Sequence, residues 1–149
     1  GIPWMLAFAL RKDGWYLRQD IIWSKPNPMP ESMRDRCTKS HEYIFLLSKS
    51  QNYFFDVDAI KQPTVDGKSM KRRKSVWEVR TKPYKGAHFA VYPTELIEPA
   101  ILAGSEEGDI VLDPFMGSGT TAVVAKSLGR HYTGCELHES YSQLIGERL

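Results

Sequence analysis

The sequence predicts an α/β fold with a mostly parallel sheet and one antiparallel hairpin. In the C-terminal third, short apolar runs of β type alternate with helical patterns, as they do in parallel sheets. A glycine-rich turn joins the first of these strands to the helix that follows it. Nearer the N-terminus, residues 42–48 and 52–57 are β-type runs separated only by residues 49–51, which is short enough for an antiparallel hairpin.

The N-terminal part begins with a predicted helix and a predicted strand. Pro3 suits the first turn of a helix, and the apolar residues after it favour a helix over residues 3–12 that Gly14 ends. Aromatic, β-branched and polar residues alternate over residues 15–24, which predicts a strand. Three prolines within residues 25–40 exclude regular pairing, so this stretch is predicted to be a long loop.

The remaining chain is predicted to contain an insert followed by a regular α/β region. Residues 61–74 are rich in cations and lack apolar periodicity, which predicts an exposed, variable basic insert, and residues 75–81 predict a short strand. Residues 94–149 contain a predicted βαβα unit. The elements expected there are a helix that contains Pro99 and ends at Gly104, a strand over 110–112, a helix over 118–128, a strand over 132–136 and a helix over 141–149.

Length and composition favour one globular domain, residues 1–149, in a reducing compartment. With 42% hydrophobic residues the chain has enough apolar side chains for a core, while its net charge of +2 says little about partners. Cys37 and Cys135 lie in unlike surroundings, so no disulfide is expected, and Cys37 with His41 lacks the further ligands of a zinc site. The apolar run over residues 2–10 is too short to cross a bilayer.

The glycine-rich turn predicts a nucleoside site at the end of a strand. The strand ends in Asp113 and turns through Gly117-Ser-Gly119 into a helix, which brings bare backbone close to a ligand above the strand. Glu136 ends the next strand, nineteen positions after Gly117, where its carboxylate can accept the hydroxyls of a ribose. Together these features indicate a ligand with a ribose.

Three kinds of ligand fit the spacing to different degrees. The pattern Gly117-x-Gly119-x-x-Ala122 formally satisfies the dinucleotide fingerprint, so an NAD-binding domain remains open. A phosphate-binding P-loop is disfavoured, because that motif requires a lysine after its last glycine, and here Thr120 and Thr121 follow Gly119. S-adenosylmethionine (SAM) has no phosphate and needs neither the lysine nor a pyrophosphate cradle.

A specific resemblance to a known family is carried by the segment Asp113-Pro-Phe-Met-Gly-Ser-Gly-Thr-Thr121. Followed by Leu128-Gly-Arg130 and Glu136, it resembles the cofactor motif of the DNA methyltransferases that modify exocyclic amino groups, cytosine N4 or adenine N6. Further segments resemble the same family in its order, namely residues 14–27, 41–49, 75–77 and 88–93. The resemblance implies a partial Rossmann-like, SAM-dependent methyltransferase fold, in which residues 94–149 form the SAM-binding unit.

The resemblance also implies a set of cofactor-binding residues. Residues before the predicted strand 110–112 would help to enclose SAM, and the glycine loop would hold its methionine portion. Phe115 would lie against SAM, and Glu136 would bind the ribose. For Phe115 the alternative is ordinary core packing, and for Glu136 it is a surface charge at the end of a strand. The implied residues are Phe89, Ala90, Pro93, Asp113, Pro114, Phe115, Gly117, Ser118, Gly119, Thr120, Thr121 and Glu136.

The residues that would present the target base are not in this sequence. An exocyclic amino group is a poor nucleophile, so the base must be flipped out and its amino group held by acceptors. The family does this with an Asp/Ser/Asn-Pro-Pro-aromatic motif, but no Pro-Pro pair occurs here. In the family's order this motif belongs upstream of Gly1, together with a strand beside residues 110–112. We therefore expect a C-terminal portion without catalytic residues, inactive by itself and dependent on an N-terminal part or a second chain.

Two basic regions are candidates for binding double-stranded DNA. A solvated surface is the usual explanation of such cations, but the resemblance favours contacts with phosphates. The candidates are Lys25, Asn27, Arg34 and Arg36 in the long loop, and Lys71, Arg72, Arg73 and Lys74 in the insert. The similarity favours cytosine N4 over adenine N6 and a cytoplasmic, bacterial or phage-encoded restriction-modification enzyme. A non-catalytic binding fragment and an NAD-binding half-domain are the alternatives.

Overall fold

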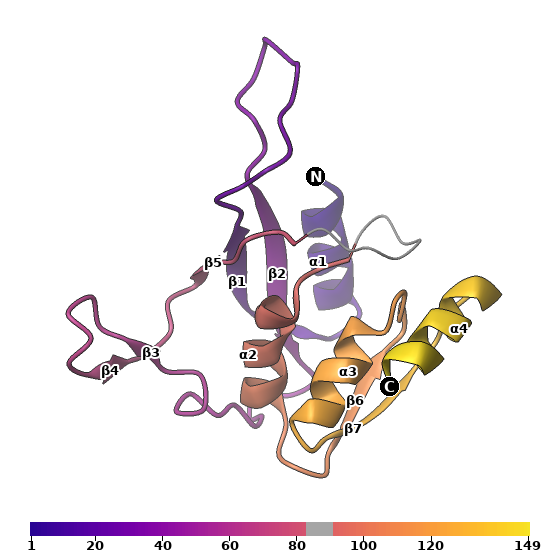
Figure 1. The fold of residues 1–149 in the computed structure, drawn as a ribbon. Coiled ribbons are helices and arrows are strands. Elements are labelled where there is room, and N and C mark those ends of the chain that lie inside the picture. The colour runs from indigo at the N-terminus through magenta and orange to yellow at the C-terminus, as the bar shows by residue number, and fades with distance from the viewer. Residues whose placement is uncertain (83–90) are drawn as a thin grey trace. The chain divides into compact units, whose positions relative to one another are not determined.

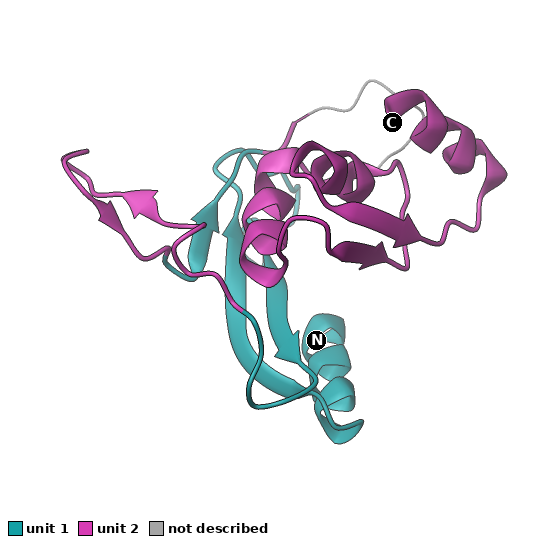
Figure 2. Cartoon of the chain, turned by 90° about the horizontal axis from the view of Figure 1, so that it is seen from below, with its two compact units in different colours: residues 1–54, 74–80 teal, residues 55–73, 81–149 magenta. Residues whose placement is uncertain are grey.

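The computed structural model describes residues 1–82 and 91–149, which form two compact units. Unit 1 comprises residues 1–54 and 74–80, and unit 2 comprises residues 55–73 and 81–149 (Figure 2). The elements, labelled in Figure 1, are α1 (Ile2–Lys12), β1 (Tyr16–Ser24), β2 (His41–Ser48), β3 (Gln62–Pro63), β4 (Met70–Lys71), β5 (Val76–Glu78), α2 (Thr94–Gly104), β6 (Ile110–Asp113), α3 (Thr120–Ser127), β7 (His131–Gly134) and α4 (Glu139–Arg148).

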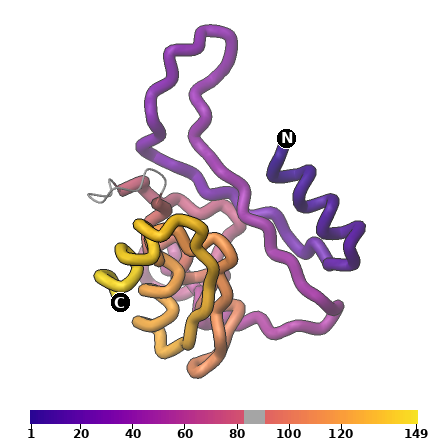
Figure 3. The backbone as a smooth tube through the Cα atoms, turned by 90° about the vertical axis from the view of Figure 1, so that its right-hand side faces the viewer, coloured from indigo at the N-terminus to yellow at the C-terminus, as the bar shows by residue number. Residues whose placement is uncertain are grey.

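Unit 1 is a three-stranded sheet with β1 in the centre. β1 pairs antiparallel with β2 and parallel with β5, so that Trp23 lies beside Trp77. Residues 25–40 connect β1 to β2 as a long excursion beyond the strand ends (Figures 1 and 3). The predicted loop is therefore confirmed, and the prolines within it explain why the ladder between β1 and β2 ends at the pair of Ser24 and His41.

The core of unit 1 is built on aromatic side chains. Ile21 and Trp23, two positions apart on β1, are both buried, and the indole N–H of Trp23 donates to the carbonyl of Val79 at 2.8 Å. On α1, Trp4 packs edge-on against Phe45 with ring centroids 4.9 Å apart. These contacts fix the helix and the parallel strand β5 to the hairpin formed by β1 and β2.

The predicted hairpin between residues 42–48 and 52–57 is wrong. The antiparallel partner of β2 is β1, and residues 52–57 form no strand. Instead the carboxylate of Asp56 accepts the backbone N–H groups of Asp58 and Ala59, both at 2.9 Å, which turns the chain. An aspartate side chain that binds nearby amides competes with strand pairing, and the apolar pattern of the segment does not reveal that competition.

Unit 2 contains the second parallel pair and the glycine loop. β6 and β7 pair in parallel from Ile110 opposite His131 to Asp113 opposite Gly134. α3 packs against both strands and α2 packs beside α3. The buried side chains Ile101, Val124 and Ala125 form the core between the two helices. The other face of β6 carries Ile110 and Leu112, which are 69% and 64% exposed.

Two details of unit 2 need a physical explanation. The predicted helix that contains Pro99 is confirmed, and Pro99 lies inside α2. Its missing N–H leaves the carbonyl of Glu95 without a helical donor, but Glu95 is on the exposed side, where water can replace that bond. The basic insert is also not wholly irregular, because β3 and β4 form a small antiparallel ladder around a turn in which Gly67 has φ +68°.

Two classes of feature are absent from the part of the chain that the structure describes. None of its helices has the length and apolar character needed to cross a membrane. No group of three or more His, Cys, Asp or Glu side chains in residues 1–82 and 91–149 is arranged to hold a metal ion.

The core between α2 and α3 predicts a large loss of stability for Ile101→Ala. Ile101 is 5% exposed, so truncation leaves a cavity and is expected to lower the free energy of unfolding by about 2–5 kcal/mol in urea denaturation. Val65→Ala is the control, because Val65 is fully exposed at 101% and its truncation is expected to change stability by about 0.5 kcal/mol or less. Equal losses for both variants would contradict this assignment of the core.

Candidate functional site

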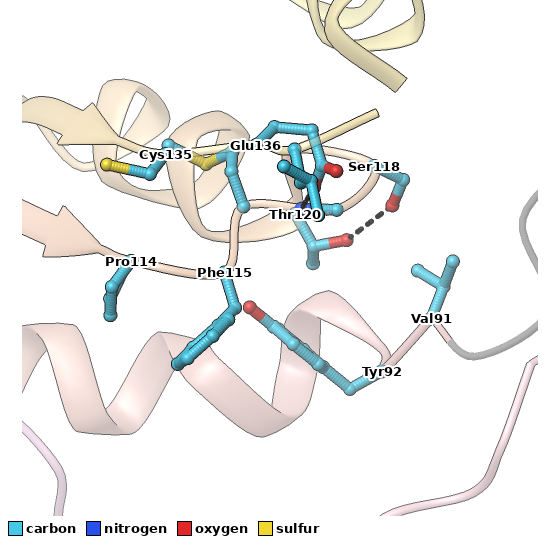
Figure 4. A pocket seen from close by; sticks show the side chains of 11 residues that line it. Val91, Tyr92, Pro114, Phe115, Ser118, Thr120, Cys135 and Glu136 are labelled. Atoms are coloured by element: carbon cyan, nitrogen blue, oxygen red, sulfur yellow. Dashed lines mark hydrogen bonds between the residues drawn. The ribbon is translucent and has the colours of Figure 1, made fainter. Parts of the chain in front are cut away.

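A pocket of about 510 Å³ opens at the carboxyl ends of β6 and β7 (Figure 4). This volume falls in the range of roughly 300–1,000 Å³ that is usual for small-molecule sites. Three segments form its walls: the residues before α2, the loop from β6 to α3, and the residues after β7. The lining residues are Val91, Tyr92, Pro114, Phe115, Met116, Gly117, Ser118, Thr120, Cys135, Glu136 and Leu137.

The glycine loop is anchored at both ends by backbone hydrogen bonds. The N–H of Met116 donates to the carbonyl of Cys135 at 2.9 Å, which ties the loop to the end of β7. The N–H of Gly119 donates to the carbonyl of Met116, also at 2.9 Å, and closes the turn before α3. Gly117 and Gly119 have φ values of +54° and +79°, a left-handed conformation that favours glycine.

Glu136 connects the end of β7 to the glycine loop. One carboxylate oxygen accepts the N–H of Gly117 and the other accepts the N–H of His138, both at 2.8 Å. These backbone amides, His138 first and then Gly117, hold the pKa of Glu136 below its usual range. The side chain is therefore an ionised, acceptor-only group on the pocket wall, with lone pairs left for further donors.

Asp113 organises the loop from the opposite side. Its Oδ1 accepts the N–H of Phe115 at 2.9 Å, and its Oδ2 accepts the hydroxyls of Thr121 at 2.5 Å and Tyr92 at 3.3 Å. The Tyr92 and Thr121 hydroxyls are also 2.5 Å apart. Burial, together with the charge of Asp113, raises the pKa of the Tyr92 hydroxyl, so that it stays a neutral donor. One carboxylate thus joins the segment before α2, the loop and α3.

The structure brings many of the residues predicted to bind the cofactor to one pocket, but not all of them line it. Those that do are Pro114, Phe115, Gly117, Ser118, Thr120 and Glu136. Pro93, Asp113, Gly119 and Thr121 belong to the same segments but are not among the lining residues. Phe89 and Ala90 lie outside the described residues.

Gly119 shows that a glycine can be required for a reason other than access of a ligand. A Cβ atom at this position would lie 3.1 Å from Cγ1 of Ile145, which belongs to α4. The space beside Gly119 is therefore filled by helix α4 and not by a ligand. Gly117, unlike Gly119, lines the pocket.

Two large apolar side chains on the pocket wall are almost fully exposed. Phe115 is 88% exposed and Leu137 is 93% exposed, although both line the pocket. Phe115 is therefore not a core residue in this structure. Large apolar side chains that are exposed in a concave site are typical of a wall that a ligand covers.

Sequence reasoning did not select several residues that line the pocket: Val91, Tyr92, Met116, Cys135 and Leu137. A usable signal existed for four of them. Val91 and Tyr92 lie within the segment 88–93 and Met116 within the segment 113–121, both of which resemble the methyltransferase family, and Leu137 directly follows Glu136. Cys135 had no such signal, because its place depends on how the loop closes against the end of β7.

The candidate DNA-binding residues of the long loop differ in their surroundings. The ammonium of Lys25 pairs with Glu42 and lies 4.4 Å from the ring centroid of Trp23. The guanidinium of Arg36 pairs with Glu31 at 3.1 Å. Two of the candidate cations of this loop therefore already face carboxylates, which lowers their capacity to bind a phosphate.

The remaining candidates are mostly exposed. Asn27 and Arg34 lie on the surface of the long loop in unit 1, and Arg72 and Lys74 are exposed in the insert, whereas Lys71 and Arg73 are half-buried. Lys71, Arg72 and Arg73 belong to unit 2, whereas Lys74 belongs to unit 1, as the candidates of the long loop do.

Comparison with known proteins gives one consistent result. The family model for N6/N4 methyltransferases, described as DNA methylase, matches residues 3–147. The Type II methyltransferase M.SmaI of Serratia marcescens is 57% identical over 150 residues, which cover 100% of this chain and 51% of that protein. The chain thus spans about half the length of the curated relative that it matches.

Solved structures are similar over nearly the whole chain. The M1.HpyAVI–SAM complex is 31% identical, with a TM-score of 0.69 over 94% of this chain and 66% of that one. The PvuII DNA methyltransferase, described as cytosine-N4-specific, has a TM-score of 0.81 over 97% of this chain and 55% of that one. Because it is only 20% identical, it shows the fold alone. These likenesses confirm the predicted partial Rossmann-like fold.

Proposed function

The chain belongs to the N6/N4 DNA methylase family, and on this premise we propose that its pocket binds SAM for methyl transfer to an exocyclic amino group of a DNA base. The observation that carries the proposal is the place of Glu136, an acceptor-only carboxylate that is hydrogen-bonded to the glycine loop and lines a pocket of suitable size. A ribose offers two hydroxyl donors, and an ionised carboxylate is the group that accepts both.

The other walls of the pocket suit the rest of SAM. The exposed apolar side chains of Phe115 and Leu137 can cover an adenine ring, which gains by leaving water. The hydroxyls of Ser118 and Thr120 can donate to the carboxylate of the methionine portion. The described lining residues include no lysine or arginine, so they lack the cation that a P-loop uses for phosphates.

Methyl transfer divides the work between this chain and groups outside it. Bound SAM supplies an electrophilic methyl group on its sulfonium. The residues of this chain bind and orient that donor, and the apolar wall excludes water from it. We propose that the acceptors for the amino group come from a Pro-Pro motif that is not in this sequence, and that the chain without that motif is a non-catalytic binding fragment.

The proposed DNA contacts are electrostatic. Arg34, Arg72 and Lys74 are exposed cations and the best candidates for phosphates, whereas Lys25 and Arg36 would first have to leave their carboxylate partners. We propose cytosine N4 as the target in preference to adenine N6, on the similarity of residues 14–27 and 88–93 to that branch of the family. The relatives named Type II methyltransferases support a role in restriction-modification.

Glu136→Gln is expected to weaken SAM binding about tenfold or more. An amide retains the shape of the side chain but loses the charge, and hydrogen bonds to charged groups contribute roughly 1.5–3 kcal/mol each. Isothermal titration calorimetry measures the change, with Glu139→Gln, an exposed residue in the first turn of α4, as the control. NAD should give no heat with the wild-type protein. Binding of NAD but not of SAM would overturn the proposed function in favour of an oxidoreductase half-domain.

Replacing Arg72 and Lys74 by alanine is expected to weaken binding to duplex DNA of any sequence. For every phosphate that the protein no longer neutralises, the slope of log Kobs against log salt should become shallower by about 0.9, because fewer counterions are released. Fluorescence anisotropy over a range of salt concentrations gives this slope. Lys12→Ala, at the exposed end of α1, is the control. An unchanged slope would exclude these two cations from the DNA interface.

The isolated 149-residue chain is expected to transfer no methyl groups to duplex DNA. A transfer assay with radiolabelled SAM tests this, with the complete relative M.SmaI as the positive control. Turnover by the isolated chain would show that the acceptors of the base are already present in it.

A further inference from the structure

An arginine of α4, the last helix of the structure, is hydrogen-bonded to the glycine loop. Arg148, at the end of α4, donates from Nη1 to the carbonyl of Ser118 at 2.5 Å and to its hydroxyl at 2.9 Å. The same nitrogen lies 3.3 Å from the hydroxyl of Thr120. One half-buried guanidinium therefore contacts the hydroxyls of Ser118 and Thr120, which both line the pocket.

The position of Arg148 is fixed by packing on both sides of it. Ile145, one turn earlier on α4, lies against Gly119, where any Cβ would come within 3.1–3.2 Å of its side chain. After Arg148, the carbonyl of Leu149 accepts a hydrogen bond from the ammonium of Lys126 on α3. The guanidinium is thus held at the loop by contacts that do not involve the pocket.

The contact with Arg148 determines what the two hydroxyls can do. A guanidinium has only donors, so each hydroxyl that meets it must use an oxygen lone pair and direct its own proton elsewhere. The Ser118 and Thr120 oxygens are 3.5 Å apart, at the outer limit of a hydrogen bond (Figure 4). Each hydroxyl proton can therefore form a shorter hydrogen bond with an acceptor in the pocket than with the other hydroxyl.

The pocket consequently has a donor end and an acceptor end. Ser118 and Thr120, with the positive charge of Arg148 behind them, favour an anionic group. Glu136, which is charged and accepts only, favours hydroxyl groups. A nucleoside that carries an amino acid has both an anionic carboxylate and ribose hydroxyls. Because each of these groups suits a different end of the pocket, the ligand fits in only one direction.

We propose that Arg148 is a positioning residue that orients SAM in the pocket. By turning the Ser118 and Thr120 hydroxyls into donors, it directs the carboxylate of the methionine portion to the start of α3 and leaves the ribose to Glu136. The inference rests on the proposed function of the pocket and assigns a role to a residue of α4 that does not line it.

Two ligands separate this role from a purely structural one. SAM carries the amino-acid carboxylate, whereas 5′-methylthioadenosine has the same nucleoside without it. In calorimetric titrations of the complete protein, Arg148→Gln is expected to weaken SAM binding about tenfold or more and to change methylthioadenosine binding by less than about twofold. Arg148→Lys should recover part of the SAM affinity, because it restores the charge. Glu147→Gln, the exposed neighbour on α4, is the matched control.

A second variant tests the same idea without touching α4. Ser118→Ala removes one of the proposed donors and should also weaken SAM selectively, so it carries the test if Arg148→Gln does not fold. An equal loss for both ligands in these variants, or unchanged SAM affinity, would overturn the orienting role. A wild-type protein that binds neither ligand would instead overturn the proposed function and this inference with it.

Discussion

The parallel pairing of β6 with β7 places Asp113 directly opposite Gly134. Because both strands run in the same direction, the loop after Asp113 and the residues after Gly134 leave the sheet at the same edge. The N–H of Met116 then reaches the carbonyl of Cys135, and Glu136 reaches the N–H of Gly117. Each wall of the pocket depends on this pairing, since a shift of one residue would move Glu136 away from the loop.

Two carboxylates turn this backbone arrangement into a binding site, and they do so in different ways. Asp113 is satisfied by groups of the protein: a backbone amide and the hydroxyls of Thr121 and Tyr92. Glu136 is satisfied only in part and remains on the pocket wall. The first therefore supports the loop, and the second is available to a ligand. Arg148 complements them with a positive charge behind the Ser118 and Thr120 hydroxyls.

Local patterns in the sequence were sufficient for most elements and for the glycine loop. The alternation over β1, the prolines after it and the glycines before α3 act over a few residues, so their structural effect is readable from the chain. The resemblance to amino-methyltransferases, which the family match confirmed, rested on the same local segments. The failure at residues 52–57 has a local cause as well, because Asp56 forms a turn where an apolar pattern predicted a strand.

The sequence by itself determined the α/β class, the family and the loop that faces the pocket. Only the tertiary structure decided which residues act on that loop from elsewhere. Tyr92 meets Asp113 across 21 positions and Arg148 meets Ser118 across 30, and β2 finds its partner in β1 rather than in the next segment. Such contacts arise when separate elements pack together, and no periodicity or local motif encodes them.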